Sequence, residues 1–225
     1  MTEEELRQHI LSATDRPGRG EQPPFAEFAF PLHPSRPIDY ELVRAQMYER
    51  ILGPCDGVFH PPTGAPHIDV CRYPPTSARP FWCYVTNGMS DFRQILPDDS
   101  WYRSEIMCAS ASQWDSAAEL LQVLGRMPFE ADTYLREYHT VPFPQGIEDP
   151  KFTYIMTIPP FLVKEFDGLS FLDEPLEVMS VIRITSDERE FAVEHSSREL
   201  VDNLPDELDT WLIDGRSTPL TKPLH

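Results

Sequence analysis

A histidine and an aspartate two positions apart offer the first side chains that could do chemistry. His67 and Asp69 lie in a segment whose alternation predicts a β-strand, so both side chains would lie on the same side of it. Imidazole nitrogen and carboxylate oxygen are ligands for zinc and related metals. His60 lies nearby in the sequence and is a third candidate ligand. The more distant candidates, which no spacing assigns to this site, are Glu105, His139 and His195. A strand with a polar edge explains the pair more simply, and we expect no bound metal and no cofactor.

A second set could form a nucleophilic triad of Ser90, Asp91 and His139. The serine of such a triad often lies in a Gly-x-Ser-x-Gly turn, but Ser90 follows a single glycine and a bulky methionine. The sequence has no glycine-rich phosphate-binding loop. We therefore predict that the chain is not an enzyme. The alternative is a metal-dependent or hydrolytic enzyme that would use His67, Asp69, Glu105 or His139.

The element that must position Ser90 and Asp91 is a continuous aromatic and apolar run at Phe81–Val85. Its length and the breakers on either side favour a strand that is buried on both faces. Because Asn-Gly tolerates positive φ, we expect a tight turn at 87–88. Ser90 and Asp91 would then bond to backbone N–H groups that the ending strand leaves unpaired.

Helical periodicity and capping patterns predict the helices. A helix over 39–52 would bury an apolar stripe of Val43, Met47 and Ile51, and Gly53-Pro54 would end it. A second helix over 114–127 would start at a cap formed by Ser116-x-x-Glu119 and would end or kink at Pro128. Shorter helical pieces are predicted over 2–13, over 133–135, and after the capping patterns at 185–188 and 196–199.

Strands are predicted over 58–59, 68–73, 105–109, 152–158 and 177–184. The short connections up to residue 109 indicate an antiparallel meander. The fold class is therefore α+β, a single domain whose mixed or mainly antiparallel central sheet has flanking helices and has 81–85 and 178–184 as inner strands. We divide the chain into an N-terminal extension (1–36), the main domain (37–195) and an acidic C-terminal helical tail packed on the domain (196–225).

The composition narrows the class of partner. The 225 residues carry a formal net charge of −18, which argues against binding to nucleic acid or to an anionic membrane and permits a basic protein partner. No apolar run is long enough to span a membrane, and the acidic N-terminus is unlike a signal peptide, so we expect a cytoplasmic protein. Four separated cysteines predict reduced, mostly buried thiols: Cys55, Cys71, Cys83 and Cys108.

An ordered set of short motifs resembles the suppressor of fused (SUFU-like) domain, stand-alone bacterial type, from about residue 40 to about residue 190. The set begins with Pro66-His67-Ile68-Asp69-Val70, Tyr73-Pro74-Pro75 and Thr86-Asn87-Gly88-Met89-Ser90-Asp91, and continues with Arg103-Ser104-Glu105-Ile106-Met107, Trp114, Glu119-Leu120-Leu121, Tyr138-His139-Thr140-Val141-Pro142, Ile158-Pro159-Pro160 and Ile182-Arg183-Ile184-Thr185-Ser186-Asp187-Glu188.

The resemblance implies a non-catalytic protein-binding module. In bacteria the family is associated with immunity proteins of polymorphic toxin systems, so the expected partner is a cognate toxin, for example a basic toxin domain. The partner-binding residues that we expect are Asp69, Asn87, Ser90, Asp91, Tyr138 and His139. At Tyr138 the chain departs from the acidic residue of the animal relatives. A regulatory scaffold without a toxin partner is the remaining alternative.

Overall fold

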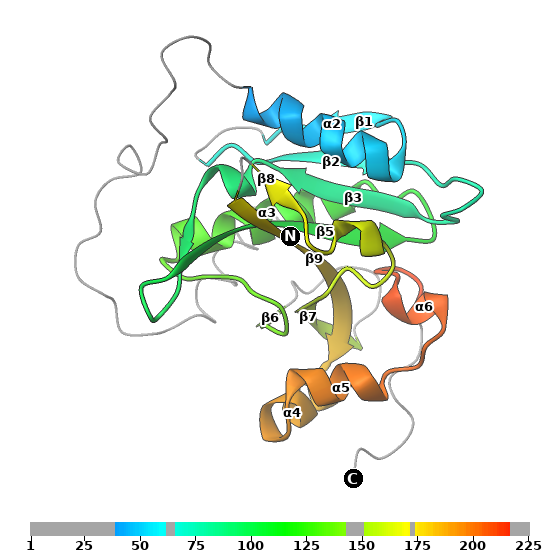
Figure 1. Cartoon of the computed structure of the whole chain (residues 1–225). Coiled ribbons are helices and arrows are strands. Elements are labelled where there is room, and N and C mark those ends of the chain that lie inside the picture. The colour runs from blue at the N-terminus through cyan, green and yellow to red at the C-terminus, as the bar shows by residue number, and fades with distance from the viewer. Residues whose placement is uncertain (1–38, 62–65, 143–150, 172–173, 217–225) are drawn as a thin grey trace.

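The computed structural model describes residues 39–61, 66–142, 151–171 and 174–216 (Figure 1). The helix predicted over 2–13 lies outside these residues. The predicted α+β class is confirmed, because in the described ranges helices flank a nine-stranded sheet that combines antiparallel pairs with one parallel pair. The three-part division of the chain stays a prediction. None of the helices in the described ranges is long and apolar enough to cross a membrane.

The sheet has the order β1-β2-β3-β5-β9-β7-β6, with β4 paired to β5 and β8 paired to β9. Its neighbours are antiparallel except for β5 and β9, which run parallel. The predicted inner strands are confirmed, since β3 lies between β2 and β5, and β9 lies between β5 and β7. The strands are β1 (Gly57–Phe59), β2 (Asp69–Tyr73), β3 (Trp82–Asn87), β4 (Gln94–Ile95), β5 (Trp101–Ser110), β6 (Thr140–Pro142), β7 (Phe152–Ile158), β8 (Ser170–Phe171) and β9 (Glu174–Thr185).

The two long helices cover opposite faces of this sheet (Figure 1). Helix α3 (Ser116–Glu130) packs on the face that carries Val70 and Tyr84, whereas α2 (Tyr40–Leu52) packs on the face that carries Cys71 and Val85. The C-terminal helices cover the end of β7 and β9 with a third apolar cluster. These C-terminal helices are α4 (Ser186–Glu194), α5 (Ser197–Asn203) and α6 (Leu208–Trp211). The described residues also form two 3-10 helices, η2 (Met89–Asp91) and η3 (Lys164–Phe166).

Helix α2 has the predicted bounds, but its predicted apolar stripe is buried only in part: Met47 and Ile51 are half-buried and pack against the core. Its buried residues are Arg44, Tyr48 and Leu52, whereas Val43 of the predicted stripe is 40% exposed. An adjacent apolar residue, Leu42, is 53% exposed. The helix turns its Arg44 side toward the sheet because Arg44 bonds to Asn87 on β3 and faces Glu105 on β5. A pattern of apolar residues cannot predict such polar contacts.

Three further predictions, for α3 and for the segment that follows it, are wrong at least in part. The N-cap of α3 is Asp115, which makes no side-chain capping bond, so the predicted cap at Ser116 is wrong. The helix continues past Pro128 to Glu130, because Pro128 is buried in its last turn and packing offsets the one lost hydrogen bond. The predicted helical piece at 133–135 is absent, because Asp132 has a φ of 48° and turns the chain out of helical conformation.

Helix α4 begins as predicted, with a complete capping box between Thr185 and Glu188. We expect Thr185→Ala to lower the free energy of unfolding by about 1 kcal/mol, since it removes the acceptor for the Glu188 backbone N–H. Urea unfolding followed by circular dichroism measures this difference. Ser197→Ala, at the first residue of α5, is the control, and an equal loss in both variants would contradict a capping role.

Candidate functional site

The turn after β3 is built on one glycine. Gly88 has a φ of 144° and precedes η2, as the sequence predicted for this position. Asn87 does not share the positive φ, so that part of the prediction is wrong. A Cβ atom at Gly88 would lie 2.6 Å from the backbone carbonyl oxygen of His67, so the turn and the start of β2 approach each other too closely for any side chain.

A buried ion pair lies directly under this turn. Arg44 and Glu105 are both fully buried, and Arg44 Nε lies 3.5 Å from Glu105 Oε1. Arg44 also donates to Asn87 Oδ1 at 2.7 Å and to the carboxylate of Asp91. Residues from α2, β3, η2 and β5 therefore meet in one network, which we call the Arg44 network: Arg44, Asn87, Ser90, Asp91 and Glu105.

Glu105 accepts hydrogen bonds from the turn as well as facing Arg44. Its Oε1 atom accepts from the backbone N–H groups of Gly88 and Ser90, at 3.2 and 2.9 Å, and from Ser90 Oγ at 2.6 Å. Burial raises the pKa of Glu105, whereas the charge of Arg44 and the hydrogen bonds from Ser90 oppose this rise. The carboxylate thus satisfies backbone donors that would otherwise be buried without a partner.

The partners predicted for Ser90 and Asp91 are wrong in kind. Both were expected to bond to backbone N–H groups, yet Ser90 donates its hydroxyl to Glu105 and Asp91 accepts from Arg44. Arg93 and Arg103, the latter of which also donates to the Ser90 carbonyl oxygen, both pair with Glu174. The cause is the same in each case: a charged side chain that is distant in sequence competes successfully for these short polar groups.

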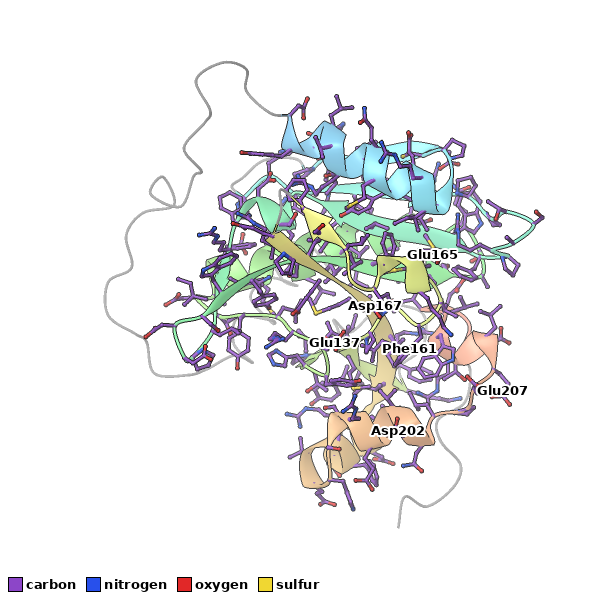
Figure 2. All side chains as sticks on the ribbon, in the orientation of Figure 1. Glu137, Phe161, Glu165, Asp167, Asp202 and Glu207 are labelled. Carbon is purple, nitrogen blue, oxygen red and sulfur yellow. The ribbon has the colours of Figure 1, made fainter. Side chains whose placement is uncertain are left out.

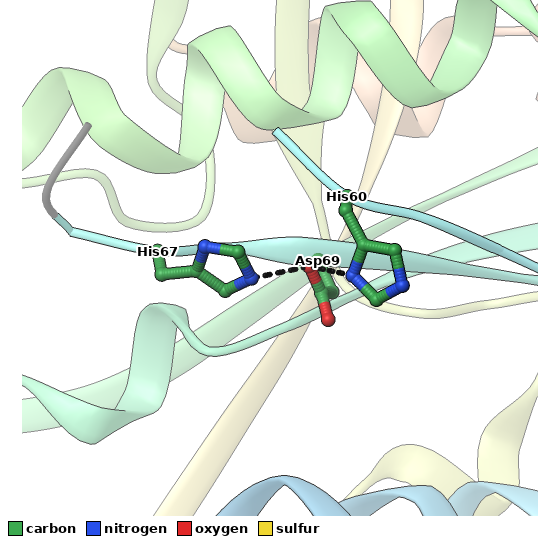
Figure 3. A group of neighbouring side chains, drawn as sticks. All are labelled: His60, His67 and Asp69. Carbon is green, nitrogen blue, oxygen red and sulfur yellow. Dashed lines mark hydrogen bonds and ion pairs between the residues drawn. The ribbon is translucent and has the colours of Figure 1, made fainter. Parts of the chain in front are cut away.

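His67 and Asp69 come together with His60, as Figure 3 shows. The Oδ1 atom of Asp69 lies 2.9 Å from His60 Nδ1 and 2.9 Å from His67 Nε2. Asp69 is 1% exposed, and both histidine side chains are more than half exposed. Glu41 on α2 lies close by, and burial followed by the Asp69 charge raises the pKa of its carboxyl.

Tyr138 and His139 lie in a different place, where the chain enters β6. Tyr138 has a φ of 68° and donates its backbone N–H to the Thr157 carbonyl oxygen. The His139 ring contacts Tyr134, with 5.0 Å between ring centroids. A hollow of about 530 Å³ opens beside them, and the residues that line it are Leu96, Pro97, Asp98, Tyr134, Arg136, Glu137, Tyr138 and His139.

The six predicted site residues therefore fall into three places. Asn87, Ser90 and Asp91 belong to the Arg44 network, Asp69 to the histidine cluster, and Tyr138 and His139 to the hollow beside β6. A Ser90-Asp91-His139 triad does not form, because the Ser90 hydroxyl is bonded to Glu105. Sequence reasoning missed Arg44 entirely, and an arginine within an otherwise apolar helix face is the only signal that could have indicated it.

The cysteines fit the prediction of reduced and mostly buried thiols. All four are free, and only Cys55 is partly exposed. Burial raises the pKa of Cys83 to about 12. A thiol of this kind stays protonated at neutral pH and is a poor nucleophile.

The comparisons with known proteins agree with this fold. A family model for suppressor of fused proteins matches residues 64–216. A protein described as a suppressor of fused homologue from Neisseria gonorrhoeae has a similar structure, with a TM-score of 0.59 and 19% sequence identity over 73% of this chain and 88% of that chain. No match was found among curated proteins.

Two further solved structures share the fold at low identity. A chain in the crystal structure of the Sufu–Fu complex has a TM-score of 0.59 at 15% identity over 80% of this chain and 90% of that chain. Drosophila Suppressor of Fused has a TM-score of 0.53 at 17% identity over 68% of this chain. The match spans 42% of the Drosophila chain, so this chain corresponds to less than half of that protein.

Proposed function

The chain belongs to the suppressor of fused family, and we propose that it is a non-catalytic protein-binding module. The observation that carries the proposal is the family match over residues 64–216. One of the structural relatives is described as part of a complex between Sufu and Fu, which makes a protein partner the natural expectation. The contacts of two candidate catalytic groups support the same conclusion, since Ser90 and Glu105 bond to each other and Glu105 faces Arg44 within the buried Arg44 network.

We propose that the partner binds at the hollow beside β6 and the acidic surface next to it. The strand β6 pairs only with β7 within the described residues, so it is an edge of the sheet where an extended segment could add. Glu137 lines the hollow, and burial followed by the charge of Glu177 raises its pKa, while the charges of Arg136 and Arg198 oppose this rise. The hollow therefore has acidic side chains beside it, although Arg136 also lines it.

This surface also carries an exposed aromatic side chain. Phe161 is 38% exposed and contacts Trp211 edge to face, so it offers an apolar anchor among charges. Figure 2 labels Phe161 together with acidic side chains from η3, from α5 and from the segments beside them. They are Glu137, Glu165, Asp167, Asp202 and Glu207.

A basic partner suits such a surface, because complementary charge speeds encounter and opposes wrong partners. The specific form of our proposal is a cytoplasmic immunity protein that neutralises a cognate basic toxin domain. The net charge of −18 supports this form. The Asn87–Asp91 turn would hold the framework of the fold, while Tyr138 and His139 would contact the partner.

The test first looks for a toxin gene next to this one, and the absence of any such gene would count against the immunity role. It then takes the toxin domain of that gene in a catalytically inactive form and measures association by surface plasmon resonance at low and high salt. We expect Glu165→Lys to slow association about tenfold at low salt, because it reverses one charge on the proposed surface. The matched control is Glu119→Lys, which reverses an exposed charge on α3 at the opposite face of the sheet.

The outcomes separate the general proposal from its specific form. If the parent chain neither binds the toxin domain nor protects cells that express the active toxin, the immunity role is wrong. If both variants slow association equally, the partner does not bind at the surface around Phe161.

A further inference from the structure

We propose that His60, His67 and Asp69 form a binding site for one divalent transition-metal ion of the zinc type, with a coordination position left open to solvent. The site is independent of the protein-binding proposal and lies away from the hollow beside β6. Within the described residues these three side chains form a group whose potential ligand atoms all lie within 4.8 Å of one another.

The sheet holds the three ligands in place. Phe59 pairs with Val70 in the antiparallel register of β1 and β2, so His60 at the end of β1 lies next to Asp69 at the start of β2. His67 precedes β2 and reaches Asp69 from the other side, as Figure 3 shows. The two imidazole rings are nearly parallel, with an interplanar angle of 28° and 6.2 Å between centroids. The carboxylate thus lies between two ring nitrogens that face it.

The distances suit a metal with short bonds to nitrogen and oxygen. A tetrahedral zinc ion with bonds of about 2.0–2.1 Å places neighbouring ligand atoms about 3.3 Å apart. Asp69 Oδ1 lies 2.9 Å from each facing nitrogen, and the potential ligand atoms all lie within 4.8 Å of one another. Rotation of the two exposed histidine side chains would bring both nitrogens to the tetrahedral spacing. The ion would replace the protons that now join the carboxylate to the imidazoles.

Burial and charge at Asp69 favour a cation as well. Its second oxygen, Oδ2, is buried and has no hydrogen-bond partner within the part of the chain that the structure describes. The carboxyl of Glu41 lies close enough to share a hydrogen bond with Asp69 and adds a like charge when it is ionised. No arginine or lysine of the described residues forms an ion pair with Asp69. A buried carboxylate in this setting is stabilised by an added positive charge.

The ligand types indicate the class of ion. Two imidazoles and one carboxylate suit zinc and its neighbours, whereas calcium and magnesium prefer oxygen ligands alone. The histidine side chains are 64% and 58% exposed, so the outer side of the site is open to water. A three-ligand site of this kind takes a water molecule as its fourth ligand.

The experiment titrates the full-length chain, stripped with a chelator and kept reduced, with Zn²⁺ against a chromophoric zinc indicator. We expect one equivalent to bind, and His60→Ala and His67→Ala each to weaken binding at least about tenfold. Both histidines are exposed, so these variants keep the fold. Asp69→Asn should weaken binding similarly, and circular dichroism shows whether that variant folds. Co²⁺ in place of Zn²⁺ should give the visible absorption of a tetrahedral nitrogen and oxygen site.

Two control variants make the result specific. His195→Gln removes an exposed histidine outside the site, and Cys55→Ser removes the partly exposed thiol. Both should bind Zn²⁺ like the parent chain. The proposal is overturned if no equivalent binds, if the two alanine variants bind like the parent, or if Cys55→Ser abolishes binding and the Co²⁺ spectrum shows thiolate charge transfer.

Discussion

Replacing Glu105 by alanine is expected to lower the free energy of unfolding by about 3–5 kcal/mol, because the fully buried Arg44 loses a carboxylate that faces it. The same change leaves the N–H groups of Gly88 and Ser90 without their side-chain acceptor. Since whole domains are stable by only about 5–15 kcal/mol, this one substitution should move the urea midpoint far below that of the parent. Equilibrium unfolding monitored by tryptophan fluorescence measures it.

A double-mutant cycle separates the ion pair from the other contacts. Arg44→Met, Glu105→Gln and the combined variant should give a coupling energy of about 1–3 kcal/mol between the two positions. The matched control is the surface pair Arg136 and Glu177, whose atoms lie 3.1 Å apart and whose coupling should stay below about 1 kcal/mol. A buried pair that couples no more strongly than this surface pair would refute the importance of the Arg44 network.

The second large effect is expected at Gly88. Gly88→Ala should cost more than about 3 kcal/mol, because backbone strain at a φ of 144° adds to a Cβ contact of 2.6 Å with the His67 carbonyl oxygen. That oxygen belongs to the backbone and cannot move aside without displacing the start of β2. The same urea experiment applies, and proteolysis of the variant would show the loosened turn directly.

Gly168 supplies the control for this prediction. It also has a positive φ, of 70°, but an added Cβ would meet nothing within 4 Å. Gly168→Ala should therefore cost only about 1–2 kcal/mol, the strain of a left-handed residue. If the two variants lose equal stability, the close approach to His67 has no energetic weight and strain alone explains the glycine.

Most elements of the fold could be predicted because their signals are local. Thr185 and Glu188 carry a complete capping box within four positions, and α4 begins there. The length and flanking breakers of the aromatic and apolar run at 81–85 favour a strand buried on both faces, and this strand lies between two neighbours in the sheet. Gly88 likewise follows from the local rule that a tight turn needs a residue free to adopt positive φ.

The candidate sites could be predicted only in part, since their partners are far apart in the chain. Arg44 is separated by 43 positions from Asn87 and by 47 from Asp91, and no periodicity in α2 indicates those partners. His67 and Asp69 could be paired because they are two positions apart in a segment predicted to be extended, although β2 begins only at Asp69. His60 joins them through the antiparallel register of β1 and β2. The non-helical 133–135 segment depends on the left-handed Asp132, which composition does not reveal.

The parallel pairing of β5 with β9 also sets the order in which the chain can fold during synthesis. Arg103 and Glu174, which pair across this contact, are 71 positions apart, so closing the loop between them costs conformational entropy that only the finished sheet repays. The strands β1, β2, β3 and β5 leave the ribosome first and can pair with short connections. Strand β5 then keeps one unpaired edge until β9 emerges, and an unpaired edge is where nascent chains associate wrongly. The centre of the sheet, where β5 pairs with β9, is therefore protected from aggregation only late in synthesis.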